Sequence, residues 1–75
     1  MENYSRYYQI IGHNIALYRK KKGLTQEGLA LKANISRTHI SHLEADGVHK
    51  VPSLDILFRL CRILEIEPYQ LFIEH

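Results

Sequence analysis

LTQEGLALKANISRTHISHLE, at residues 24–44, predicts two short helices joined by a tight turn. Thr25 and Ser36 each precede a helical apolar pattern, and a side-chain oxygen at such a position accepts a hydrogen bond from the first turn. Asn34 ends the first helix, because asparagine tolerates the left-handed conformation that a tight turn requires. The residues expected to face inward are Leu29, Ala30 and Ala33 in the first helix and Ile40 and Leu43 in the second.

The rest of the chain predicts three further helices and no strands, because its apolar residues recur at helical spacing. These helices are expected at Tyr7–Lys22, after Ser53, and at Pro68–Ile73. Gly23 stops the first of them, and Gly47 and Pro52 mark a loop over residues 46–52. The inward-facing residues are expected to be Ile11, Ile15, Tyr18, Leu54, Leu57, Leu60, Cys61, Leu64, Leu71 and Phe72. We therefore expect an all-α fold of five short helices, forming a single domain over residues 1–75.

The composition limits where this chain works. It has 75 residues and one cysteine, Cys61, so its fold rests on packing without an intramolecular disulfide, as suits a reducing cytoplasm. No apolar run approaches the ~20 residues of a membrane helix, and residues 1–4 lack the features of a signal peptide. We expect a cytoplasmic protein without a membrane partner.

The net charge of +2 is unevenly distributed. Residues 1–43 hold seven Lys or Arg and two acids, whereas residues 44–75 hold three Lys or Arg and six acids. A basic half is expected where one face meets a polyanion. The run from Arg19 to Lys22 has a second explanation, since cations also stabilise the negative end of a helix dipole.

The outward face of the helix after Ser36 has the chemistry of DNA recognition. With Ile40 and Leu43 directed inward, the residues left to point outward are Arg37, Thr38, Ser41, His42 and Ala45. None is acidic. Arginine bonds guanine O6 and N7 or a phosphate, hydroxyls donate or accept, and histidine donates to a purine N7. Two helices joined by such a turn allow the second to enter a major groove.

Three motifs occur in order at family spacing: LTQEGLA at 24–30, ISRTHISHLE at 35–44 and PSLDILFRLCRIL at 52–64. Together they resemble the phage-repressor and Cro type of helix-turn-helix protein, the XRE family, over about residues 11–72. The resemblance implies a compact five-helix, lambda-repressor-like domain whose helix-turn-helix occupies about residues 25–45. It also implies a bacterial or phage-like regulator that binds double-stranded DNA and associates with the nucleoid.

The resemblance further implies roles for individual residues. Phosphate contacts are expected from Thr25, Gln26 and Lys50, and base contacts from Arg37, Thr38 and His42, with Ser41 beside them. Gln26 is also expected to brace the recognition helix. Arg19 and Glu44 match a pair that forms a partly buried salt bridge, in which the loss of either partner strands a charge.

The chain departs from the family pattern at three places. Gly28 replaces the usual Glu or Asp, which removes a capping-box acid and costs the helix roughly 1 kcal/mol relative to Ala. Asn34 replaces a turn glycine. The loop after Glu44 is about one residue longer than in the shortest relatives, which bears on the assignment of Lys50.

We expect structural roles for the remaining histidine, cysteine and tyrosine residues. His39 and His42, with His49 nearby, lack a clear further ligand, so we expect no metal site and no cofactor. Cys61 lies on a core face and is interpreted as a small buried hydrophobe. Tyr4, Tyr7 and Tyr8 are expected to pack against the first helix. No constellation resembles a catalytic site or a small-molecule site, so we do not expect an enzyme.

Apolar residues outside the main core faces of the last two helices raise the question of a dimer. They are Ile56, Ile63, Tyr69 and Ile73. They either complete a small core or form a two-fold surface within residues 54–75, where this family often dimerises. We favour the dimer, which would set two recognition helices about 34 Å apart on an inverted repeat. The alternative function is a protein-interaction module of the antitoxin type that binds DNA secondarily.

Overall fold

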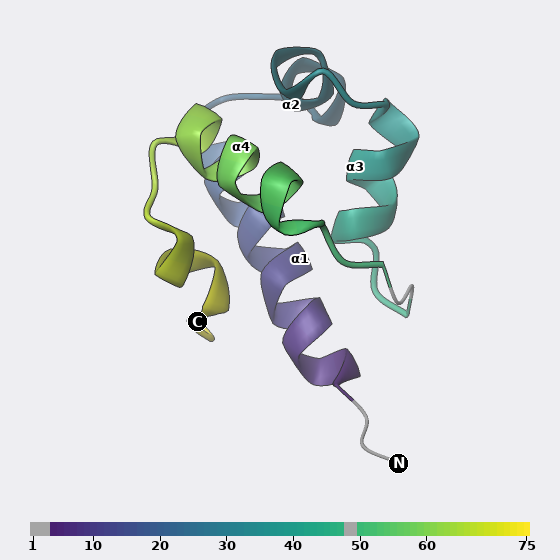
Figure 1. Cartoon of the computed structure of the whole chain (residues 1–75), viewed down its shortest axis with the longest axis vertical. Coiled ribbons are helices and arrows are strands. Elements are labelled where there is room, and N and C mark those ends of the chain that lie inside the picture. Colours follow the sequence, from purple (N-terminus) through teal and green to yellow (C-terminus); the bar gives the residue numbers. More distant parts are fainter. Residues whose placement is uncertain (1–3, 48–49) are drawn as a thin grey trace.

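The computed structural model describes residues 4–47 and 50–75, and within them it contains helices and no strands. The elements are α1 (Ser5–Lys21), α2 (Gln26–Ala33), α3 (Arg37–Glu44), α4 (Leu54–Leu64) and the 3-10 helix η1 (Pro68–Phe72) (Figure 1). The all-α class is confirmed. The fifth element was expected as an α-helix to Ile73, but it is a 3-10 helix, a conformation common in pieces as short as five residues. No helix in the described part of the chain is long and apolar enough to span a bilayer.

The predicted caps and turns are present. The hydroxyls of Thr25, Ser36 and Ser53 each accept a hydrogen bond from the backbone N–H three residues ahead, at 2.9, 3.0 and 3.2 Å respectively. Asn34 has a φ of 57°, as the left-handed turn between α2 and α3 requires. Of the predicted loop at 46–52, Val48 and His49 lie outside the described residues, and the remainder is not helical.

The core lies between α1, α4 and the α2–α3 pair, with η1 closing one side. Its buried apolar residues are Ile11, Ile15, Leu29, Ala30, Ala33, Ile40, Leu43, Leu57, Leu60, Cys61, Leu64 and Leu71. All of these were predicted to face inward, and Tyr18, also predicted, packs against them from a half-buried position.

Two residues predicted to face inward are exposed instead. Leu54 is 68% exposed, because it stands in the first turn of α4 at the edge of the apolar stripe centred on Leu57. Phe72 is exposed because successive residues of a 3-10 helix diverge by a third of a turn, so the burial of Leu71 turns Phe72 toward solvent.

Two of the three tyrosines near the N-terminus, which were predicted to pack against the first helix, are exposed. Tyr7 and Tyr8 are residues of α1 itself, as in the predicted helix, and α1 begins two residues earlier than predicted, at Ser5. Tyr4 and Tyr7 are exposed, with ring centroids 6.4 Å apart, whereas Tyr8 is half-buried.

A buried amide fastens the C-terminal segment to α1. Asn14 is 3% exposed and donates hydrogen bonds to the carbonyl oxygens of Leu71, at 2.9 Å, and Ile73, at 2.8 Å. Buried polar groups need partners, and these two carbonyls satisfy both amide hydrogens. Arg6 and Glu74 add an exposed ion pair between the same two segments.

Gly12 lets α1 pass directly beside the end of α3. A Cβ atom at this position would lie 2.3 Å from the carbonyl oxygen of Leu43, much closer than any real contact of a Cβ atom. The absence of a side chain at Gly12 therefore sets the distance between α1 and the helix expected to meet DNA.

Gly12→Ala is expected to lower the free energy of unfolding by about 1–3 kcal/mol, as overpacked positions do. The loss should appear even though alanine favours a helix by about 1 kcal/mol over glycine. Denaturant unfolding followed by circular dichroism measures it. Gln9→Ala, at an exposed position of α1, serves as the control and should change stability by less than about 0.5 kcal/mol. A Gly12→Ala variant as stable as the control would refute the close approach.

Candidate nucleic-acid interface

The α2–α3 unit presents the outward residues of α3 on one exposed surface. Arg37, Thr38 and His42 are exposed and Ser41 is half-buried. A shallow hollow of about 170 Å³ is lined by Arg37, Thr38 and Ser41. Arg37 and Thr38 belong to the first turn of α3, and no acid stands on that turn. The arrangement exposes hydrogen-bonding groups at the end of α3 that would enter a groove first.

A second hollow joins α3 to the start of α2. Its volume is about 430 Å³, and its lining residues are Arg19, Thr25, Gln26, Glu27 and Arg37. Arg37 therefore borders both hollows, between the N-terminal ends of the two helices. The α2 end offers backbone N–H groups and the positive end of a helix dipole, which favour an anion such as a phosphate.

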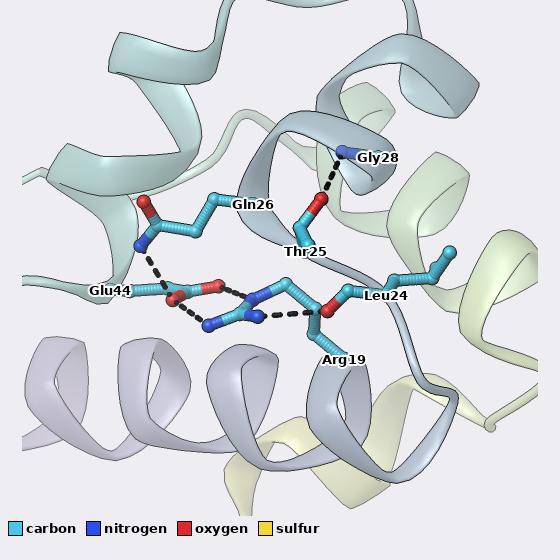
Figure 2. Close-up of polar contacts among 6 residues, drawn as sticks. All are labelled: Arg19, Leu24, Thr25, Gln26, Gly28 and Glu44. Atoms are coloured by element: carbon cyan, nitrogen blue, oxygen red, sulfur yellow. Dashed lines mark hydrogen bonds and ion pairs between the residues drawn. The ribbon is translucent and has the colours of Figure 1, made fainter.

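The structure contains the Arg19–Glu44 ion pair that the family resemblance led us to expect. The Nε and Nη2 atoms of Arg19 donate to Oε2 and Oε1 of Glu44, at 2.8 and 2.9 Å (Figure 2). Only 10% of the arginine side chain and 7% of the glutamate side chain are exposed. Such a bidentate pair has the strongest geometry available to an arginine and a carboxylate.

The same two residues bind the flanking elements. The Nη1 atom of Arg19 donates to the carbonyl oxygen of Leu24, at 2.9 Å, in the segment between α1 and α2. Gln26 donates its Nε2 hydrogen to Oε1 of Glu44, at 3.0 Å, and this contact uses one of the two amide hydrogens. Figure 2 shows the resulting network, which joins α1, the start of α2 and the end of α3.

The network keeps Arg19 charged. The hydrogen bonds to Glu44 raise the pKa of Arg19, burial lowers it by a smaller amount, and the negative charge of Glu44 raises it further. Arg19 is therefore positively charged throughout the pH range in which proteins fold.

Other candidate residues are spread around this surface or away from it. Thr25 and Lys50 are exposed, and His39 is half-buried. His49 lies outside the described residues. Among residues 4–47 and 50–75 no group of three or more His, Cys, Asp or Glu is placed to hold a metal ion. Cys61 is buried as predicted, and desolvation, followed by the charge of Glu67, raises the pKa of its thiol.

The residues predicted for a dimer surface fall into two groups. Ile56 and Ile63 are half-buried and pack against the core, whereas Tyr69 and Ile73 are exposed. Within residues 54–75, the exposed apolar residues that the sequence prediction missed or placed inside are Leu54, Phe58 and Phe72. Leu54 and Phe58 are one turn apart on α4, a spacing visible in the sequence, but their exposure depends on where the neighbouring elements pack.

The family described as Helix-turn-helix matches residues 15–71. This chain belongs to the helix-turn-helix family. The helix-turn-helix at its centre is the α2–α3 unit, and the match extends through α4 to η1.

Relatives of this helix-turn-helix protein have names that identify transcriptional regulators. The HTH-type transcriptional regulator SlrR of Bacillus subtilis (strain 168) is 40% identical over 63 residues, which are 84% of this chain and 41% of SlrR. The HTH-type transcriptional regulator SinR of Bacillus subtilis (strain 168) is 31% identical over 65 residues, 87% of this chain and 58% of SinR. The chain thus spans about two-fifths to three-fifths of the length of these curated relatives.

Solved structures of other helix-turn-helix proteins are similar. The restriction-modification controller protein C.AhdI from Aeromonas hydrophila has a TM-score of 0.76 and 34% identity, covering 87% of this chain and 96% of its own. SinR, the master regulator for biofilm formation, in a structure with DNA, has a TM-score of 0.76 and 30% identity. That match covers 84% of this chain and 98% of the SinR chain.

Arg19→Met is expected to lower the free energy of unfolding by about 3–5 kcal/mol, because it leaves the Glu44 carboxylate buried without its counterion. Arg19→Met combined with Glu44→Leu should recover most of that loss, since no charge is then buried. Denaturant unfolding of all three proteins measures both effects. Arg6→Met removes an exposed ion pair and should cost less than about 1 kcal/mol. Equal losses for Arg6→Met and Arg19→Met would contradict a central role for the buried pair.

Proposed function

We propose that this helix-turn-helix protein is a transcriptional regulator that binds double-stranded DNA sequence-specifically by placing α3 in the major groove. The observation that carries the proposal is the exposed surface of α3, where Arg37, Thr38 and His42 stand without an acid among them. The names of SlrR and SinR, and the solved structure of SinR with DNA, support it.

The residues proposed to contact DNA divide into those that provide affinity and those that provide sequence specificity. Thr25, Gln26 and Lys50 would contact phosphates, which position the protein without selecting a sequence. Arg37, Thr38, Ser41 and His42 would contact base edges. Gln26 already donates one amide hydrogen to Glu44, so a phosphate would receive the other, and the same residue would link the DNA backbone to the buried ion pair.

We propose further that the protein acts as a homodimer on an inverted repeat, in the cytoplasm, where it has access to the nucleoid. Tyr69 and Ile73 remain the predicted surface residues, and Leu54, Phe58 and Phe72 join them because all five are exposed on α4 or at the C-terminal segment. Ile56 and Ile63 would contribute less, because the core already covers part of each side chain. A two-fold axis would set the two α3 helices about one DNA turn apart.

Arg37→Ala should relax discrimination at one base position by about 1–3 kcal/mol, because a single base-edge contact is lost. Binding is measured at a stated salt concentration to the preferred site and to sites substituted at each position. Lys32→Ala removes an exposed cation in the last turn of α2, outside the helix ends that border Arg37, and should leave discrimination unchanged. An Arg37→Ala variant that lost affinity equally for all sequences would show a phosphate contact instead of a base contact.

Selection of bound sequences from random DNA tests the assembly. We expect an inverted repeat whose half-site centres are about 10 base pairs apart, because the two recognition helices would enter successive major grooves on one side of the duplex. A single half-site would contradict the dimer and leave sequence-specific binding intact. Recovery of no common sequence would contradict sequence-specific recognition and favour a module that acts mainly on another protein.

A further inference from the structure

α1 carries an apolar stripe that continues beyond the body of the molecule. Tyr4, Tyr8, Ile11, Ile15 and Tyr18 follow one another at intervals of three or four residues, which places them on one side of the helix, and Tyr7 borders the same side. Ile15 is completely buried, whereas Tyr7, about two turns earlier, is 59% exposed. The stripe is therefore covered in the C-terminal half of α1 and open to solvent in its first turns.

The open end of the stripe lies beside the C-terminal segment. Tyr7 precedes Asn14 by seven residues, or close to two full turns, so both side chains leave α1 in nearly the same direction. Asn14 donates hydrogen bonds to the carbonyl oxygens of Leu71 and Ile73, so its side of α1 is the side that faces η1. Figure 1 shows α4 and η1 flanking α1 while its first turns extend past both of them.

The first turns of α1 also lie outside the part of the chain that matches the family. That match begins at residue 15, whereas α1 begins at Ser5. Tyr7 therefore lies outside the residues that the family match covers. An exposed aromatic residue next to a segment with several other exposed apolar residues indicates an interaction surface.

We propose that Tyr7 and the first turns of α1 form part of the interface with a second copy of this chain. The interface would combine them with the exposed apolar residues of α4 and the C-terminal segment, which are Leu54, Phe58, Tyr69, Phe72 and Ile73. This inference rests on the proposed homodimer. It adds the first turns of α1 to an interface otherwise formed by α4 and the C-terminal segment.

The size of a stable interface supports this extension. A specific protein interface of standard size buries about 800 Å² on each partner and involves about 20–30 residues a side. The five C-terminal apolar residues occupy a small region. Two of them are in α4, two are in the five-residue helix η1, and one directly follows η1. The first turns of α1 extend the same side of the molecule and add an aromatic side chain of the kind that dominates interface energies.

The charges around this surface favour a second copy over a strongly charged partner. Arg6 pairs with Glu74 between α1 and the C-terminal segment. This pair contributes both signs, so these two residues give the rim no net charge. In a two-fold interface the same patch meets itself, and a balanced rim avoids the repulsion that a single sign would cause.

Sedimentation equilibrium of the full chain tests the inference with Tyr7→Ala, Tyr69→Ala and Leu31→Ala. We expect Tyr7→Ala and Tyr69→Ala each to raise the dimer Kd about tenfold or more, as the loss of a central aromatic contact does. Leu31 is the matched control, because it is a large apolar residue, 76% exposed, on α2. Leu31→Ala should leave the Kd within about twofold of the wild-type value. Alanine favours helix, so α1 should keep its circular dichroism.

The outcomes separate this inference from the proposed dimer. An unchanged Kd for Tyr7→Ala beside a raised Kd for Tyr69→Ala would overturn the role of α1 and leave the dimer in place. A wild-type chain that stays monomeric at every concentration would overturn both. Hydrogen exchange of wild-type residues 4–10 needs no variant: slower exchange above the dimer Kd than below it supports the inference, and equal exchange contradicts it.

Discussion

The Arg19–Glu44 ion pair connects the end of α1 to the end of α3, and through Leu24 and Gln26 it also holds the start of α2. Both charges are largely removed from water, so each is compensated by the opposite charge of its partner and by the neighbouring hydrogen bonds. Because the carboxylate of Glu44 accepts from two helices, α3 is fixed in position relative to α1 and α2 together. The orientation of the surface expected to meet DNA depends on this one internal contact.

Packing around the ion pair reinforces the same geometry. Gly12 allows the backbone of α1 to approach the carbonyl of Leu43, directly before Glu44, so the two helices are close enough for Arg19 to reach its partner. Ile40 and Leu43 bury the inner face of α3 against the core. The side chains on the outer face of α3 do not contribute to the core, and their hydrogen-bonding groups are presented on a helix that the core holds in place. A rigid presentation lowers the entropy lost when those side chains bind.

Two sides of the molecule differ in the chemistry of their exposed side chains. The exposed surface of α3 that includes Arg37, Thr38 and His42 is polar, whereas α4, η1 and the start of α1 expose apolar side chains. Asn14, on α1, fixes the C-terminal segment of the apolar side through two backbone carbonyls. If two copies meet through the apolar side, the spacing of their α3 helices would depend on how firmly that segment is held.

Local sequence patterns determined the helices, their caps at Thr25, Ser36 and Ser53, the left-handed turn at Asn34 and most of the core, because each follows from neighbours three or four residues apart. The same patterns determined which residues of α3 point outward. Only the tertiary structure decided that Leu54 and Phe72 are exposed, that Ile56 and Ile63 are half-buried, and that Gln26 donates to Glu44. These outcomes depend on which element covers each face, and contacts between residues far apart in the chain decide that.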